Sequence, residues 1–441
     1  MRTRKYKSER LPAPAWIAGF LLAAVCLSAA ESASLPQKSS LSNGLPIIYQ
    51  KDTASGVTVL TFLIRGGQKA EPDGMDGLSY LTARLSVEIP DQDKVQDLMV
   101  RATRHSLTSK SDFSLIQLEC LSENLEETLK IFAGIMMDPL FSGLRINFVK
   151  ENMAHLQNIQ SDDSVNVGHL AQLDAFFGKT GYGRSIFGTE GSLKKIKGRD
   201  IENFYKQQFL TNRMACAVIS DLDSEKVLAL LQKYLSKFPS GESAAPSDGS
   251  AQASSAATPK ERFIEKETKQ CLVSMAFSLP ATSAKTFVLN YLLENLLGKG
   301  PGSRLWALRS EEKLAYNVNA QATQMRDAGI LEAYLETDAA KTGPASEALK
   351  KVLTGLFEKG LGEDELQIAK VSATAQFLRL NETKDKRAST FAIFEGLGLG
   401  YDFFSKFSQD IEAVTLAEMN SYIKNILGPE KASLVVVGPK K

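Results

Sequence analysis

An arginine and a tyrosine, Arg309 and Tyr316, flank a change of hydrophobic period in the second half of the chain. The stretch opens at Gly298 as a Gly/Pro-rich loop, and a helical pattern follows for which Ser303 fits the N-cap. From Tyr316 onward the residues alternate as in a strand. A guanidinium and a phenol can both donate hydrogen bonds to a carbonyl or carboxylate oxygen. On spacing alone, the favoured interpretation is an exposed arginine and a half-buried tyrosine without a binding role.

Other constellations for catalysis are absent from the sequence. The histidines are His105, His155 and His169, and none lies four residues from another or next to a cysteine. They are therefore expected to be ordinary surface or core residues, and no Ser/His/Asp or Cys/His set recommends itself. The loop at Gly298 lacks the Gly-Lys-Ser/Thr ending that a phosphate-binding loop needs.

The N-terminus has the pattern of an export signal. A basic start precedes an apolar run over residues 16–30 that is short for a membrane span, and residues 28–30 offer a small-residue cleavage site. We expect residues 1–30 to be a signal peptide and the protein to be exported, to the periplasm in a bacterium. An uncleaved membrane anchor is the alternative. A lipoprotein signal at Cys26 is disfavoured because Val25 is bulky.

The charge balance and the cysteines exclude further classes. Without residues 1–30 the chain has 47 basic and 50 acidic residues, so its net charge is about −3, which argues against a nucleic-acid partner. The remaining cysteines, Cys120, Cys216 and Cys271, are odd in number and widely spaced. This pattern predicts buried thiols rather than a disulfide framework or a zinc knuckle.

The predicted elements recur in the same order in two halves of the chain, about 212–218 residues apart. The matching pairs are the strands 57–64 and 272–279, the strands 114–121 and 330–337, and two helix–strand units. The first unit is a helix at 200–209 with a strand at 214–220, and the second is a helix at 416–426 with a strand at 432–437. The repeat predicts an α+β fold of two homologous α/β halves, each a mixed sheet with helices packed on one face.

A segment rich in serine and alanine separates the halves at residues 240–260. It has no large apolar residue and is expected to be a flexible linker that lets the halves close like a clam. The expected domains are therefore residues 31–239 and 261–441.

The residues around the arginine and the tyrosine resemble a known family. The run Ser303-Arg304-Leu305, Leu308-Arg309 and Leu314-Ala315-Tyr316 is similar to the C-terminal-half signature of the pitrilysin-type (M16) metallopeptidases. The resemblance extends from about Leu41 to Val437, with support at 43–45, 182–189 and 204–212. It implies two LuxS/MPP-like halves, with Arg309 and Tyr316 gripping substrate main chain opposite a zinc site.

The zinc site of that family is degenerate here. The resemblance aligns the inverted motif His-x-x-Glu-His with a helix in which Tyr80 and Arg84 replace the two ligands and Ala83 replaces the general base. Asn158, seven residues after Glu151, replaces the third ligand. We therefore expect no metal or other cofactor in this chain and no peptidase activity from it alone.

The resemblance suggests a bacterial M16B-like non-catalytic subunit. It would bind peptide or unfolded protein within an exported heterodimeric zinc peptidase, opposite a partner that carries His-x-x-Glu-His and the zinc ion. The alternative is a structural scaffold with no role in proteolysis, in which Arg309 and Tyr316 only pack. A self-sufficient hydrolase is the least favoured reading, because the sequence has few histidines.

Overall fold

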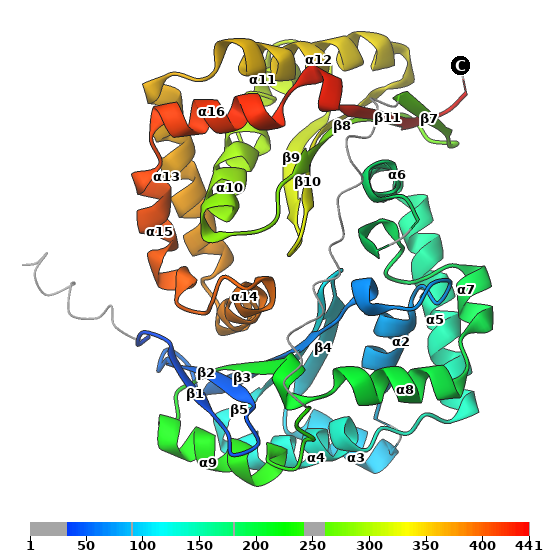
Figure 1. The fold of residues 1–441 in the computed structure, drawn as a ribbon, viewed down its shortest axis with the longest axis vertical. Coiled ribbons are helices and arrows are strands. Elements are labelled where there is room, and N and C mark those ends of the chain that lie inside the picture. Colours follow the sequence, from blue (N-terminus) through cyan, green and yellow to red (C-terminus); the bar gives the residue numbers. More distant parts are fainter. Residues whose placement is uncertain (1–32, 90, 180, 242–260, 441) are drawn as a thin grey trace, which may run out of the picture.

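The computed structural model describes residues 33–89, 91–179, 181–241 and 261–440. The predicted signal peptide and most of the predicted linker lie outside these residues. Two lobes are visible, each built on one mixed sheet with helices around it (Figure 1). Within the described ranges, no helix is both long and apolar enough to cross a membrane.

The first sheet has the strand order β1-β2-β6-β3-β5-β4, in which only the β2–β6 pair is parallel. Its strands are β1 (Gln37–Ser40), β2 (Pro46–Lys51), β3 (Val57–Arg65), β4 (Arg104–Ser109), β5 (Phe113–Leu121) and β6 (Met214–Ser220).

The second sheet repeats the β2-β6-β3-β5-β4 part of this plan in the order β7-β11-β8-β10-β9, with β7–β11 as its parallel pair and antiparallel pairing elsewhere. Its strands are β7 (Glu261–Glu265), β8 (Gln270–Leu279), β9 (Asn317–Gln324), β10 (Gly329–Asp338) and β11 (Ser433–Gly438). Five strands of each lobe thus pair in the same order and direction, as the repeat in the sequence predicts.

The helices follow the same repeat. The first lobe contains α2 (Leu78–Leu85), α3 (Gln92–Val100), α4 (Leu125–Met137), α5 (Gly143–Asp162), α6 (Ser164–Phe177), α7 (Glu190–Lys195), α8 (Gly198–Gln208) and α9 (Ser224–Leu235). The second contains α10 (Ala284–Gly298), α11 (Trp306–Ser310), α12 (Thr342–Lys359), α13 (Glu363–Leu380), α14 (Lys384–Leu397), α15 (Phe403–Ala413) and α16 (Leu416–Ile426).

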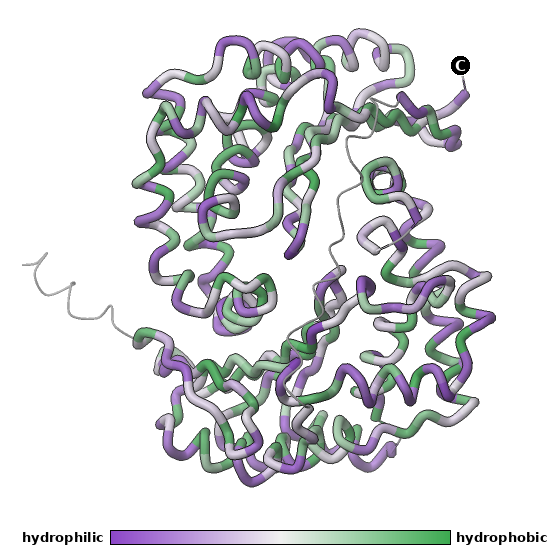
Figure 2. The backbone as a smooth tube through the Cα atoms, viewed as in Figure 1, coloured by the Kyte–Doolittle hydropathy of each residue, from purple (hydrophilic) through white to green (hydrophobic). Residues whose placement is uncertain are grey.

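Successive residues of the central strands face opposite sides of their sheet, and both sides are buried. On β3, Leu60 and Phe62 share a core with Phe132 of α4 and Leu231 of α9, which belong to the same lobe. The central strands of both sheets run through mostly hydrophobic sequence (Figure 2), whereas the edge strands β4 and β9 are largely polar. The predicted fold class is therefore confirmed, including one face covered by the lobe's own helices.

The other face of the first sheet is covered by a helix of the second lobe. Val59 and Leu63 of β3 form a core cluster with Ala388 and Phe391 of α14 (Figure 1). At the end of α14, Gly396 allows close approach, because a Cβ atom there would lie 2.7 Å from Leu63 and 2.8 Å from Phe113. Burial of this apolar surface fixes the position of the second lobe relative to the first.

Helix α6 of the first lobe covers one face of the second sheet in the same way. Ala171 packs with Leu272 of β8 and with Val437 of β11, and Phe176 packs with Ala276 of β8. Gln172 is fully buried and donates to the carbonyl oxygens of Ser274 at 3.0 Å and Ser433 at 3.3 Å. Each sheet is thus closed by one helix from the opposite lobe.

Several predicted elements are confirmed with the same bounds, among them the strand at 214–220 and the helix at 416–426. The predicted burial of the cysteine thiols is also confirmed for Cys120, Cys216 and Cys271. The prediction of Ser303 as an N-cap is wrong. The next helix, α11, begins three residues later without a side-chain cap, and the Ser303 hydroxyl donates instead to the carbonyl oxygen of Gly300 at 2.7 Å.

A buried lysine ties α14 to the first lobe and gives a test of this arrangement. Lys384 Nζ donates to the carbonyl oxygens of Asp52, Ser55 and Val57 at 2.7, 2.7 and 2.9 Å. Because K384A leaves these acceptors without their donor, we expect the free energy of unfolding to fall by about 2–3 kcal/mol. K386A, at an exposed position of the same helix, should change it by less than about 0.5 kcal/mol. Urea unfolding measures both, and equal effects would contradict the role of Lys384.

Candidate functional site

The helix that resembles the zinc helix, α2, is positioned by a buried carboxylate. Its N-cap is Gly77, at φ +91°, which provides no side chain for the first turn. Instead, the carboxylate of Glu71 accepts from the N–H groups of Gly77 at 3.1 Å and Ser79 at 2.8 Å. Glu71 is buried, so these bonds compensate part of its lost hydration.

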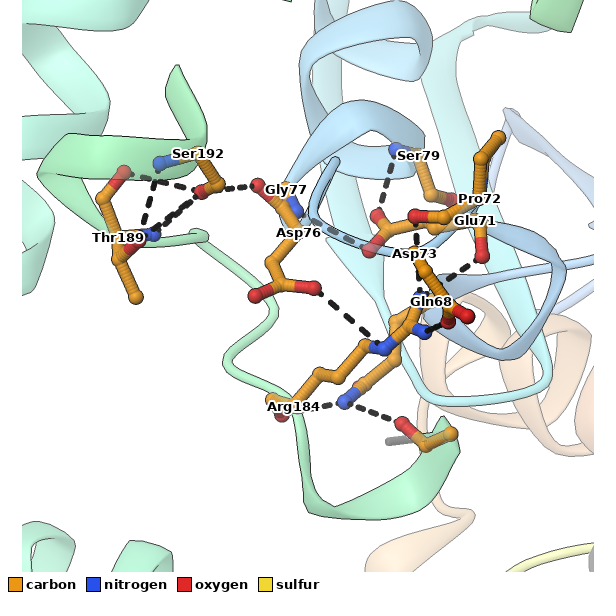
Figure 3. A network of polar contacts seen from close by, with 11 residues as sticks. Gln68, Glu71, Pro72, Asp73, Asp76, Gly77, Ser79, Arg184, Thr189 and Ser192 are labelled. Carbon is orange, nitrogen blue, oxygen red and sulfur yellow. Dashed lines mark hydrogen bonds and ion pairs between the residues drawn. The ribbon is translucent and has the colours of Figure 1, made fainter. Parts of the chain in front are cut away.

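Arg184 holds the loop that carries Glu71 (Figure 3). Its guanidinium donates to the carbonyl oxygen of Glu71 at 2.7 Å, lies 3.4 Å from the carboxylate of Asp76, and also pairs with Asp73. Ser192, at the start of α7, donates to the carbonyl oxygen of Asp76 at 2.8 Å. The segments 71–79 and 182–192 therefore form one polar network around the start of α2, and the second segment includes the residues 182–189 that support the family resemblance.

The positions on α2 that would bind zinc form a different set of contacts. Tyr80 is half-buried and packs edge-on against Phe187, with ring centroids 4.8 Å apart, and burial raises its pKa. Ala83 is buried. Arg84 Nε lies 2.9 Å from Glu88 Oε2, so the cation at the second ligand position is already paired.

The third ligand position lies on α5, where Asn158 is exposed. Its carbonyl oxygen accepts from the Ser161 hydroxyl at 2.8 Å, a contact within the last turns of the helix. Among the residues that the structure describes, no group of three or more His, Cys, Asp and Glu side chains could hold a metal ion. The residues at these four positions do not fit zinc, because none of them offers an imidazole or carboxylate donor.

Two of the histidines lie near charged groups without forming a metal site. Burial and the charge of Arg84 lower the pKa of His105 on β4. His169 Nδ1 on α6 lies 2.5 Å from Glu332 Oε2 on β10, and this contact joins the two lobes.

Arg309 and Tyr316 lie on either side of a short connection between α11 and β9. The N–H of Leu314 donates to the carbonyl oxygen of Leu308 at 2.9 Å, which brings the residue before Arg309 next to the strand entrance. Lys313 in the turn between them has φ +52°, which reverses the chain direction sharply. Arg309 is exposed, and its Cζ lies 4.9 Å from the ring centroid of Trp306.

Tyr316 is 54% exposed, immediately before β9. Its N–H donates to the carbonyl oxygen of Glu336 at 2.9 Å, and its hydroxyl donates to Asp338 Oδ1 at 2.9 Å. The sequence analysis gave both Arg309 and Tyr316 donor roles toward a bound oxygen. In the structure the hydroxyl proton is directed at Asp338, and this bond raises the pKa of Tyr316.

The outer edge of β9 is covered by α10. Glu294 Oε2 accepts from the N–H of Ala322 at 2.9 Å, and Lys299 Nζ donates to Asn319 Oδ1 at 3.1 Å. Gly298 lies so close to the backbone of Ala320 that a Cβ atom would overlap it. The corresponding edge strand of the first sheet, β4, pairs only with β5 in the part of the chain that the structure describes.

Glu71, Asp338 and Trp306 were not predicted as site residues from the sequence, and no function was predicted for Arg184. Arg184 and Glu71 are 113 residues apart, and no periodic pattern joins them. Trp306 precedes Arg309 by three residues, a spacing that puts both on one side of a helix, so this signal was available.

Residues 195–372 match the family model described as the peptidase M16 inactive domain. Over 407 residues the chain is 25% identical to a Helicobacter pylori protein named "Non-peptidase homolog YmxG", covering 90% of this chain and 92% of that protein.

Two solved structures have the same fold. One is a peptidase M16 inactive domain from Pseudomonas fluorescens, with a TM-score of 0.83, 18% identity, and coverage of 92% of this chain and 98% of that one. The other is a protease from Helicobacter pylori, with a TM-score of 0.83, 17% identity, and coverage of 92% and 100%.

The buried carboxylate of Glu71 makes stability depend on pH. Burial raises the pKa of Glu71 to about 8, above the value of about 4.3 expected in the unfolded chain. The folded state therefore keeps this proton to higher pH, and the contribution of Glu71 to the free energy of unfolding falls as pH rises from about 4.5 to 8. We expect E71Q to remove this fall.

Urea unfolding between pH 5 and 8 measures the difference. The stability of the wild type should decline relative to E71Q as pH rises, whereas E267Q, at an exposed position, should follow the wild type. Parallel pH profiles for the wild type and E71Q would show that Glu71 does not titrate in this way.

Proposed function

We propose that this chain, an inactive homologue of the M16 peptidases, is the substrate-binding subunit of an exported heterodimeric zinc peptidase. In this proposal Arg309 and Tyr316 bind the main chain of a peptide or unfolded protein. A partner subunit with His-x-x-Glu-His supplies zinc, the metal-bound water and the general base. The enzyme would therefore be complete only where the two subunits face each other.

The observation that carries the proposal is the contrast between the two candidate sites. At Tyr80, Ala83, Arg84 and Asn158 the chemistry of hydrolysis is replaced. Arg309, by contrast, is exposed, and Tyr316 on the other side of the turn is also exposed and is held by its own hydrogen bond. Exposed polar groups with fixed orientation are suited to hold a substrate in place for reaction elsewhere.

The covered edge of β9 supports a division of labour between subunits. An extended peptide gains main-chain hydrogen bonds by adding to an open sheet edge. Because Glu294 already accepts from Ala322, a peptide held by Arg309 and Tyr316 cannot extend this sheet along β9. Its strand-like pairing would come from the sheet of the partner, with this chain gripping from the opposite side.

The experiment combines capture of the partner with a point variant. The mature protein is used as bait in the cell-envelope fraction, the captured partner is identified by mass spectrometry, and the pair is purified for peptide hydrolysis. Because R309A removes charge-assisted donors to the substrate, we expect kcat/KM to fall about 10- to 100-fold while the complex stays intact in size-exclusion chromatography. R199A, an exposed arginine on α8, should leave kcat/KM unchanged.

Two outcomes would contradict the proposal. If R309A and R199A have the same kcat/KM as the wild type, Arg309 does not bind substrate. If the bait brings down only itself or a large assembly without a His-x-x-Glu-His subunit, the scaffold alternative replaces the peptidase subunit.

A further inference from the structure

Asp338 determines whether the Tyr316 hydroxyl can donate or accept a further hydrogen bond. An ionised carboxylate can only accept hydrogen bonds, so the 2.9 Å contact with Asp338 Oδ1 uses the single hydroxyl proton of Tyr316. Lys341 Nζ lies 3.7 Å from the other oxygen of Asp338 and pairs a positive charge with it. What the exposed hydroxyl still offers to a ligand is the lone pairs of its oxygen.

The sheet holds Asp338 in this position. Asp338 is the last residue of β10. Tyr316 is also hydrogen-bonded to β10, because its N–H donates to the carbonyl oxygen of Glu336. The neighbouring Thr337 hydroxyl donates to the carbonyl oxygen of Leu314 at 2.6 Å. Lys341 also donates to the carbonyl oxygen of Lys313 at 3.2 Å, which fastens the turn before the strand. The contact between Tyr316 and Asp338 is therefore held by the backbone on both sides.

Arg309 has the opposite polarity. A guanidinium carries only donors, and the ring of Trp306 contacts one side of it. Stacking of this kind orients the guanidinium without using its N–H groups, which stay available to an acceptor. The pair therefore combines a donor, Arg309, with an acceptor, Tyr316, on two sides of one short turn.

A donor and an acceptor on the two sides of one turn match the two polar groups of a peptide unit. We propose that Asp338 is a positioning residue that makes Tyr316 an acceptor for a substrate N–H, while Arg309 donates to a neighbouring substrate carbonyl. The inference rests on the proposed function and deepens it. It defines the substrate class as extended peptides with a free main-chain N–H at one position, and it predicts rejection of proline or an N-methylated residue there.

The test is an N-methyl scan with the purified two-subunit complex. The probes are a short fluorogenic peptide that the complex cleaves and its derivatives, each with one N-methylated main-chain amide. At one position, N-methylation should lower the kcat/KM of the wild type, and the factor of this loss is the N-methylation penalty. In Y316F the penalty at that position should be about 2- to 10-fold smaller. Comparing each penalty between variants cancels the effect of N-methylation on the peptide itself.

Variants at Asp338 separate positioning from simple packing. D338A should lose most of the Tyr316-dependent penalty, because the hydroxyl proton is then free to turn toward the substrate. D338N keeps an oxygen that accepts from Tyr316 and should retain most of the penalty. The matched control is Y234F, since the Tyr234 hydroxyl on α9 also donates to a carboxylate, that of Glu126, at 3.0 Å. It should leave every penalty unchanged.

The outcomes distinguish this inference from the proposed function. If R309A lowers kcat/KM but no N-methyl penalty changes in Y316F or D338A, the acceptor role is wrong and the proposed function stands. If neither R309A nor Y316F affects cleavage of any probe, the proposed function fails and the inference fails with it. Thermal unfolding of each variant shows whether a loss reflects damage to the fold.

Discussion

Both sheets of this protein have two apolar faces, and the helices of one lobe cover only one of them. The second face of the first sheet is closed by α14, and the second face of the other sheet is closed by α6. Without this exchange, Val59 and Leu63 in one lobe and Leu272 and Val437 in the other would face water. The apolar burial that stabilises each lobe is therefore the same burial that joins the lobes, and every candidate site residue is positioned within that frame.

The residues that position α2 differ from the residues on α2 that would supply its chemistry. Glu71 and Arg184 still define the start of α2 through buried hydrogen bonds, although that helix now carries Tyr80, Ala83 and Arg84. Around Arg309 and Tyr316 the supporting residues and the exposed polar groups occur together. A lobe whose helix lacks zinc ligands and a lobe with an oriented polar pair are consistent with the proposed binding subunit.

Local patterns were enough to predict much of the fold, and they failed where residues distant in sequence meet. The seven-residue strand β6 has its predicted bounds because every residue of Met214–Ser220 is apolar or small and buried. The role of α14 could not be predicted, because a local sequence pattern does not say which sheet a helix covers. Arg309 and Tyr316 were found from their types and a family resemblance. Asp338 was missed because strand pairing, not sequence spacing, brings it to Tyr316 across 22 residues.

The most direct test is zinc-dependent hydrolysis of an unfolded peptide by this chain, by the proposed partner with His-x-x-Glu-His, and by the two together. We expect this chain alone to be inactive, the proposed partner alone to be much slower than the mixture, and a chelator to abolish the activity of the mixture. Hydrolysis by this chain alone, or a mixture no faster than the partner, would contradict the proposed function.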